Sequence, residues 1–173
     1  MSTTKHIWTI GHSTHTFEHF LSMLQSFSID CLIDVRTFPG SRRYPHFNKE
    51  NLQTALRENG IGYQHFIALG GRRKPKEDSS NTAWRHPNFR GYADHMASAG
   101  FNAAFAELQS LAESKNVAYM CSEAVWWRCH RSLISDALKA KGWNVRHIMD
   151  VQVSKEHPYT SPARVEQGNL FYN

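Results

Sequence analysis

The sequence predicts a three-layer α/β fold, in which a mostly parallel sheet of about five strands carries helices on both faces. Short β-prone segments alternate with amphipathic segments of 10 to 14 residues, an order that favours parallel pairing. The length of 173 residues suits one domain, and the 40% apolar and 20% charged fractions are typical of globular proteins. We expect a single domain over residues 1–173.

Three segments in the first half are short and β-prone: 6–10, 31–35 and 61–67. Between the first two, phenylalanines and leucines recur at helical spacing over 17–27, with Thr16 placed to cap the helix. A second helix is expected over 48–59, with Asn48 as its cap and Gly60 as its terminator. The first half therefore contains two β-α-β units.

The segment at about 70–96 is basic and rich in Pro, Ser and Asn, yet it contains Trp84, Phe89 and Tyr92. A flexible linker has little use for large aromatic side chains, so we expect an ordered insertion or lid.

The remaining elements are expected in the order helix, strand, helix, strand. They are placed at 101–112, 117–121, 130–141 and 144–149. The 101–112 helix has the clearest amphipathic pattern of the chain, and Gly142 ends the next helix. An irregular tail is expected after the last strand.

The basic residues are unevenly distributed. The chain has 20 Lys and Arg against 15 Asp and Glu, a net charge of +5. Between Arg36 and Arg90, 11 Lys or Arg face four acidic residues, so this segment carries 11 − 4 = +7. Such an excess points to an anionic partner, either a small molecule or nucleic acid, although a solvated basic loop is the alternative.

The cysteines and the hydropathy bear on location and cofactors. No run approaches the roughly 18 apolar residues of a membrane span, so we expect a cytoplasmic protein without a membrane partner. Cys31, Cys121 and Cys129 form no C-x-x-C pair, which suits a reducing compartment. Their spacing with His130 matches no usual zinc pattern, so we expect no metal and no cofactor.

The segment Cys121–Arg131 gathers reactive side chains between a strand end and a helix start. The free N–H groups of that helix start, together with Arg128 and Arg131, favour an anion, and the same field lowers the pKa of a nearby thiol. Cys129, expected to be exposed beside His130, is therefore the candidate nucleophile. Cys121 is more simply interpreted as a buried residue that ends a strand.

A phosphate-binding loop of the cysteine phosphatase or rhodanese type is a weaker interpretation of the same segment. Arg128 follows Cys121 one position too late for such a loop, and no glycine turns the loop N–H groups inward.

Two other predicted strands also end in polar residues. The first is followed by Gly11, His12 and Ser13, and the second by Asp34, Arg36 and, further on, Arg42. An unpaired buried carboxylate is costly, so Asp34 needs Arg36 or Arg131 as a partner, in a catalytic or a purely structural ion pair. Because ligands of such sheets bind beyond the carboxyl ends of the strands, we expect one shared pocket.

Four aromatic residues lie among arginines, an arrangement found where proteins stack nucleic-acid bases: Trp84, Phe89, Trp126 and Trp127. Aromatic residues of this kind more often pack in a core or under a lid.

The whole chain resembles the bacterial family called domain of unknown function 488. The motifs that carry the resemblance are T-I-G-H-S at 9–13, L-I-D-V-R at 32–36, L-G-G-R at 69–72, G-Y-A at 91–93, M-C-S-E at 120–123, C-H-R at 129–131 and H-P-Y-T at 157–160. The resemblance suggests a pocket shared by Gly11, His12, Ser13, Asp34, Arg36, Glu123, Cys129, His130 and Arg131. It implies no substrate.

The leading hypothesis is a hydrolase or transferase that acts on a phosphorylated or otherwise anionic substrate, such as a nucleotide or nucleic acid. Arg36, Arg131 and the C-H-R helix start would bind the anion, Glu123 or His12 would exchange protons, and Cys129 would attack. The alternative is a non-enzymatic module that binds nucleic acid.

Overall fold

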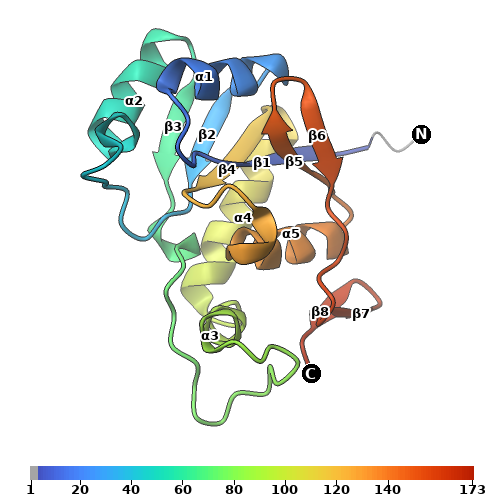
Figure 1. Ribbon diagram of the computed structural model, residues 1–173. Coiled ribbons are helices and arrows are strands. Elements are labelled where there is room, and N and C mark those ends of the chain that lie inside the picture. Colours follow the sequence, from blue (N-terminus) through green and yellow to red (C-terminus); the bar gives the residue numbers. More distant parts are fainter. Residues whose placement is uncertain (1–3) are drawn as a thin grey trace.

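The computed structural model describes residues 4–173 and shows an α/β fold, drawn in Figure 1. The first three residues of the predicted domain lie outside this range. The central sheet has six strands in the order β3-β2-β4-β1-β5-β6. Their bounds are β1 His6–Gly11, β2 Cys31–Asp34, β3 Gly62–His65, β4 Val117–Cys121, β5 Asn144–Asp150 and β6 Val153–Glu156.

The sheet is parallel except at one edge. Every neighbouring pair runs parallel apart from β5 and β6, which are antiparallel. The mostly parallel sheet predicted from the sequence is thus confirmed. It has one strand more than expected, because the chain turns back immediately after β5 and pairs 153–156, part of the expected irregular tail, with that strand.

Helices cover both faces of the sheet. Their bounds are α1 Phe17–Ser26, α2 Lys49–Glu58, α3 Pro87–His95, α4 Ala99–Ser114 and α5 Arg131–Ala140. In Figure 1, α1 and α2 lie on one side of the sheet and α3, α4 and α5 on the other. The helix α3 lies inside the segment expected to be irregular. Pro87 is compatible with a first helical turn, and the His86 side chain accepts from the Asn88 N–H.

Two apolar cores separate along the alternation of β4. Val117, Tyr119 and Cys121 pack with α3, α4 and α5, whereas Ala118 and Met120 pack with α1 and α2. Successive strand residues point to opposite faces, so a strand covered on both sides must be apolar throughout. All five residues of β4 are buried, as this predicts.

The helix ends agree in part with the expected caps. Thr16 accepts a hydrogen bond from the His19 N–H and begins α1. Asn48 occupies the position before α2, but its side chain accepts from the Ser41 N–H instead of capping the helix. That bond ties the loop after β2 to the helix that follows it.

The chain outside the main sheet is more ordered than expected. The predicted irregular tail also contains a hairpin formed by β7 Arg164–Glu166 and β8 Asn169–Phe171. Within the basic insertion, the buried Asp94 carboxylate of α3 accepts from the Lys76 N–H, the Ser79 hydroxyl and the Asn81 amide. This fastens the irregular stretch to α3; its behaviour as a lid stays a prediction.

The topology leaves a crevice where β1 and β4 meet. The loop after β1 leads to α1 on one face, whereas the loop after β4 leads to α5 on the opposite face. Loops that part in this way open a space at the carboxyl ends of the strands, which is where α/β folds bind ligands.

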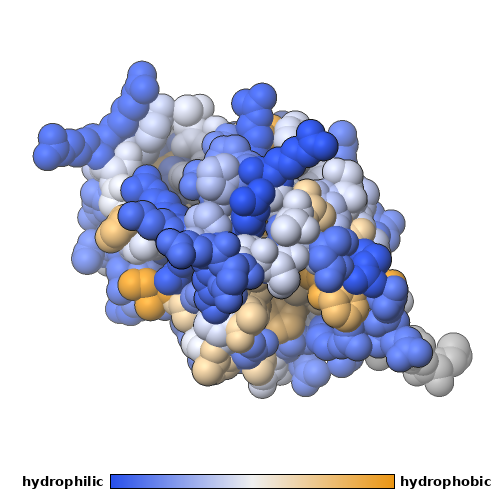
Figure 2. Space-filling view, turned by 90° about the horizontal axis from the view of Figure 1, so that it is seen from below, coloured by the Kyte–Doolittle hydropathy of each residue, from blue (hydrophilic) through white to orange (hydrophobic). Residues whose placement is uncertain are grey.

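Figure 2 shows a largely hydrophilic surface with apolar residues in small patches on the face it presents. None of the helices within residues 4–173 is long and apolar enough to cross a membrane.

Candidate functional site

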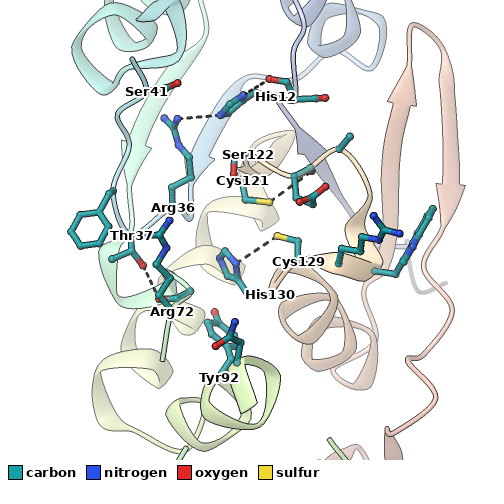
Figure 3. Close-up of a pocket in the computed structure, with 18 of the residues that line it drawn as sticks. His12, Arg36, Thr37, Ser41, Arg72, Tyr92, Cys121, Ser122, Cys129 and His130 are labelled. Atoms are coloured by element: carbon teal, nitrogen blue, oxygen red, sulfur yellow. Dashed lines mark hydrogen bonds between the residues drawn. The ribbon is translucent and has the colours of Figure 1, made fainter. Parts of the chain in front are cut away.

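A cavity of about 880 Å³ lies at the carboxyl ends of β1, β2 and β4 (Figure 3). Its wall comes from the loops after these three strands, from Gly71 and Arg72, and from α3 and the residue before it. Of the sequence-predicted site residues, the structure brings six into this wall: His12, Ser13, Arg36, Glu123, Cys129 and His130. The other four, Gly11, Asp34, Arg42 and Arg131, do not line it.

Asp34 and Arg36 form a buried ion pair, of which only Arg36 reaches the cavity wall. The Arg36 Nε and Nη2 atoms donate to the two Asp34 carboxylate oxygens at 2.9 and 2.7 Å, and the Arg36 backbone N–H donates at 3.1 Å. The Tyr63 hydroxyl donates to the same carboxylate. With its acceptor sites occupied and its side chain fully buried, Asp34 orients Arg36 rather than contacting a ligand.

Arg36 presents its remaining nitrogen to the cavity. Its Nη1 atom lies 3.4 Å from His12 Nε2, and His12 Nδ1 lies 2.9 Å from the Ser13 carbonyl oxygen. Since a carbonyl can only accept, Nδ1 carries the proton and Nε2 accepts from Arg36. Burial, aided by the Arg36 charge, lowers the pKa of His12 to about 4, so the imidazole is neutral at pH 7.

Cys129 and His130 form a thiol–imidazole pair on the other side of the cavity. His130 Nε2 lies 2.7 Å from the Val35 carbonyl oxygen, to which it must donate, and its Nδ1 atom lies 3.6 Å from Cys129 Sγ. Burial lowers the pKa of His130, so Nδ1 is unprotonated and accepts from the thiol. A thiol, an imidazole beside it and a carbonyl that orients the imidazole are the three parts that nucleophilic catalysis by cysteine uses.

The His130 ring is held between two neighbours. A Cβ atom on Gly71 would lie 2.9 Å from His130 Nδ1, so only glycine lets this loop pass the ring without displacing it. The Tyr92 ring packs on another side, 5.1 Å away between centroids. The L-G-G-R and G-Y-A motifs thus meet at His130, which neither motif indicated on its own.

Arg131 lies under the cavity and not in its wall. Its guanidinium is 1% exposed and donates to Cys121 Sγ at 3.0 Å, Thr9 Oγ1 at 2.8 Å and the Glu123 carbonyl oxygen at 2.6 Å. No carboxylate within residues 4–173 lies within 4 Å of it. Expected to bind substrate, Arg131 is instead a buried cation surrounded by neutral acceptors and thiols.

The two thiols near Arg131 are perturbed in opposite directions. Burial would raise the pKa of Cys129, but the Cys121 thiol, the Arg131 charge and the Arg131 backbone N–H outweigh it and lower the pKa to about 7. Burial together with Cys129 raises the pKa of Cys121 well above its usual value. Cys129 is only 7% exposed, not exposed as expected, because it packs in the apolar core that also contains Tyr92 and Cys121.

Gly11 and Arg42 lie outside the site for different reasons. A Cβ atom on Gly11 would lie 1.9 Å from the Glu123 carbonyl oxygen, so this glycine allows the loops after β1 and β4 to touch. Arg42 is exposed on the loop after β2 and reaches none of the cavity wall. The prediction that both bind substrate directly finds no support in their positions.

Two exposed aromatic rings and two arginines line the cavity, and of these Phe38 and Arg72 were not selected from the sequence as ligand-binding residues. Phe38 is 70% exposed, Trp127 is 53% exposed, and the Arg72 guanidinium lies 5.8 Å from the centre of the Phe38 ring. Arg128 is also in the wall. An aromatic residue in a loop after a strand was the available signal for Phe38.

The other aromatic residues considered for base stacking are mostly occupied. Trp84 stacks on Phe89 at 4.9 Å and packs against the core. Trp126 lies parallel to the His147 ring at 4.5 Å. Phe89 and Trp127 are the two of the four that reach the cavity.

Among the described residues, no group of three or more His, Cys, Asp or Glu side chains is arranged to hold a metal ion.

Comparisons with known proteins identify one family. The model of the family described as "Domain of unknown function DUF488" matches residues 16–138, more than half of the chain. Neither the curated proteins nor the solved structures contain a match.

Proposed function

The chain belongs to the DUF488 family, whose description carries no activity, and we propose that it is a hydrolase or transferase with Cys129 as its nucleophile. Its substrate is a phosphorylated or otherwise anionic molecule. The observation that carries this proposal is the buried Arg131 residue. Its guanidinium donates to Cys121 Sγ, its backbone N–H donates to Cys129 Sγ, and no carboxylate within residues 4–173 lies within 4 Å of its charge. An uncompensated buried cation stabilises an anion beside it, and the Cys129 thiolate is the anion this site can form.

The geometry supports a two-step reaction. As Sγ of Cys129 bonds to the electrophilic atom of the substrate, His130 Nδ1 takes the thiol proton and delivers it to the leaving group. In the second step, water or another acceptor loses a proton to His130 and attacks the same atom. The bond to sulfur then breaks, and the proton on His130 returns to the thiolate or to solvent.

The charges of the cavity wall support an anionic substrate. Arg36, Arg72 and Arg128 face a single carboxylate in the wall, that of Glu123. Arg36 is held rigidly by Asp34, so its Nη1 atom is preorganised to bind an anion. Glu123 and the neutral His12 stand at the edge of the same space, where they can exchange protons with a bound ligand.

Phe38 and Trp127 favour a nucleotide or a nucleic-acid strand among the anionic substrates. Both rings are exposed at the cavity, and arginines adjoin them. Exposed rings next to arginines can stack a base while the guanidinium groups hold its phosphate.

Covalent trapping tests the proposal. The protein is incubated with p-nitrophenyl phosphate, with a panel of nucleotides and with single-stranded oligonucleotides, and intact mass and peptide mapping report adducts on Cys129. We expect turnover of a member of the panel, an adduct on Cys129, and loss of both in Cys129→Ala. Turnover that persists undiminished in Cys129→Ala would show that Cys129 is not the nucleophile. The activity would then come from another catalytic residue.

A second candidate function is a binding module for nucleic acid without catalysis, which the exposed Phe38 and Trp127 rings also favour. Fluorescence anisotropy with labelled oligonucleotides distinguishes the two. Binding that weakens steeply with salt, is lost in Trp127→Ala and comes without turnover would support the module. The enzyme proposal expects the Cys129→Ala variant to bind and only the wild type to react.

A further inference from the structure

We infer that a buried chain of hydrogen bonds from Asp136 to Arg131 positions the Arg131 guanidinium against Cys121 Sγ, beside the Cys129 thiol that accepts from the Arg131 backbone N–H. Thr9, His147 and His157 are thereby positioning residues for the nucleophile. The inference rests on the proposed role of Cys129 and deepens it. It also accounts for the His-Pro-Tyr-Thr motif, which lies far from the cavity in sequence and takes no part in the reaction proposed above.

Four bonds make up the chain. Arg131 Nη1 donates to Thr9 Oγ1 at 2.8 Å, and Thr9 Oγ1 lies 2.7 Å from His147 Nδ1. His147 Nε2 lies 2.8 Å from His157 Nδ1, and His157 Nε2 lies 2.8 Å from Asp136 Oδ1. All five side chains are buried. Each link therefore forms in a low-dielectric interior, where an unsatisfied polar atom is costly.

The two ends of the chain have fixed roles, because Arg131 can only donate and the Asp136 carboxylate accepts. One arrangement with a single proton on each imidazole satisfies all four links. Thr9 accepts from Arg131 and donates to His147 Nδ1, His147 donates from Nε2 to His157 Nδ1, and His157 donates from Nε2 to Asp136. Burial, with His157 and Arg131 nearby, strongly lowers the pKa of His147, which agrees with its neutral state.

This direction matters for Arg131. Because the Thr9 proton is committed to His147, a Thr9 lone pair always faces the guanidinium. The Glu123 carbonyl holds Nη2 on the other side, and Nε then points at Cys121. In the absence of a carboxylate close by, these neutral acceptors orient a charge that must stay beside the two sulfur atoms.

The C-terminal segment of the protein holds Asp136, which is the far end of the hydrogen-bond chain. Asp136 also accepts from the Thr160 N–H, the Thr160 hydroxyl and the Tyr172 hydroxyl. Trp126, which directly precedes the cavity residue Trp127, stacks on His147. The tail and the loop after β4 are thus connected through one buried network. Two members of that network, His157 and Thr9, lie outside the segment matched by the family model.

The test measures the rate of Cys129 alkylation by iodoacetamide from about pH 5 to about pH 10, followed by peptide mapping. Thr9→Val keeps the shape of the side chain and removes the acceptor; Thr9→Ser keeps the hydroxyl. We expect Thr9→Val to raise the apparent pKa of Cys129 by about one unit, so that alkylation below pH 7 slows about tenfold. Thr9→Ser should retain the wild-type profile, an outcome that a general packing defect would not produce.

A folded Thr9→Val protein with an unchanged profile would overturn the inference. If Thr9→Val does not fold, two substitutions of His157 replace it. Asn at 157 can place an amide oxygen near the position of Nδ1 and keep the acceptor for His147, whereas Gln places its amide near Nε2 and removes that acceptor. We expect a raised pKa of Cys129 in His157→Gln and the wild-type value in His157→Asn; equal values in the two variants would contradict the chain.

The proposed function and this inference fail separately. A wild-type Cys129 that shows an ordinary thiol pKa and forms no substrate adduct would remove the proposed function. If Cys129 has a lowered pKa and forms the substrate adduct, but the pH profile of its alkylation does not change in Thr9→Val, only the inference about the hydrogen-bond chain fails.

Discussion

Two buried arginines, Arg36 and Arg131, lie near the carboxyl ends of the parallel strands and differ in the groups that balance their charge. Arg36 is neutralised by Asp34 through two side-chain bonds, and it offers one nitrogen to the cavity. Arg131 has sulfur, hydroxyl and carbonyl acceptors, and no carboxylate within residues 4–173 lies within 4 Å of it. Under the proposed function, the paired Arg36 is a fixed donor for a ligand, whereas the unpaired Arg131 stabilises an anion formed by the protein itself.

Breaking the Arg36 pair should have the largest effect. Asp34→Asn leaves a buried guanidinium without its counter-ion, and we expect the free energy of unfolding to fall by about 3 to 5 kcal/mol. Urea unfolding measures this. Asp150→Asn, which removes an exposed carboxylate paired with His19, is the control and should change little. If Asp34→Asn lowers the free energy of unfolding as little as the control does, the negative charge of Asp34 does not stabilise the fold.

The Cys129 thiolate should appear as a pH dependence of stability. Its pKa of about 7 in the folded chain lies below the ordinary value of 9.0. A group with a lowered folded pKa contributes stability that is present above the unfolded pKa and lost as the pH falls through the folded pKa. Between about pH 6 and pH 9.5, wild type should gain about 2 to 3 kcal/mol relative to Cys129→Ser. Parallel curves for the two proteins would contradict a thiolate.

Removing the unpaired charge tests its partner directly. In Arg131→Met, burial is opposed only by the Cys121 thiol and the backbone N–H of residue 131, and we expect the pKa of Cys129 to return to about 9. The rate of alkylation at pH 7 should then fall about fiftyfold, since the thiolate fraction drops from about one half to about one hundredth. Arg128→Gln, which removes an exposed arginine of the cavity wall, should leave the rate within about twofold. Equal rates for wild type and Arg131→Met would argue against the pairing.

The smallest effect concerns the base. Gly71→Ala places a methyl group 2.9 Å from His130 Nδ1 and should weaken the hydrogen bond with Cys129. We expect alkylation of Cys129 to slow by about threefold to tenfold, the equivalent of one modest hydrogen bond. Gly100→Ala, where a Cβ atom meets nothing within 4 Å, should behave as wild type. A Gly71→Ala rate equal to that of Gly100→Ala would mean that the His130 ring can move freely.

The sheet was accessible from the sequence because its signals are local. The alternation in β4 and the helical spacing of Phe20 and Leu24 depend on neighbours within a few residues. The edge strand β6 and the helix α3 were missed. β6 is stabilised by pairing with β5, and the largely polar start of α3 resembles the loop before it.

The site was accessible only in outline, since its details depend on distant contacts. The sequence predicted Arg36, Cys129 and His130 at the site because they follow strands, and the carboxyl ends of parallel strands lie at the same end of the sheet. Nothing local indicates that Arg131 points inward, because its partners Thr9 and Cys121 come from other strands. The departure of Arg131 from its predicted place in the cavity wall is therefore a result of tertiary packing.

The account depends most on the state of one sulfur atom. The pH dependence of Cys129 alkylation in the wild-type protein, read by peptide mapping, tests it most directly. The account predicts a rate that rises through an apparent pKa of about 7. A midpoint at the ordinary cysteine pKa of 9.0 or above would contradict it.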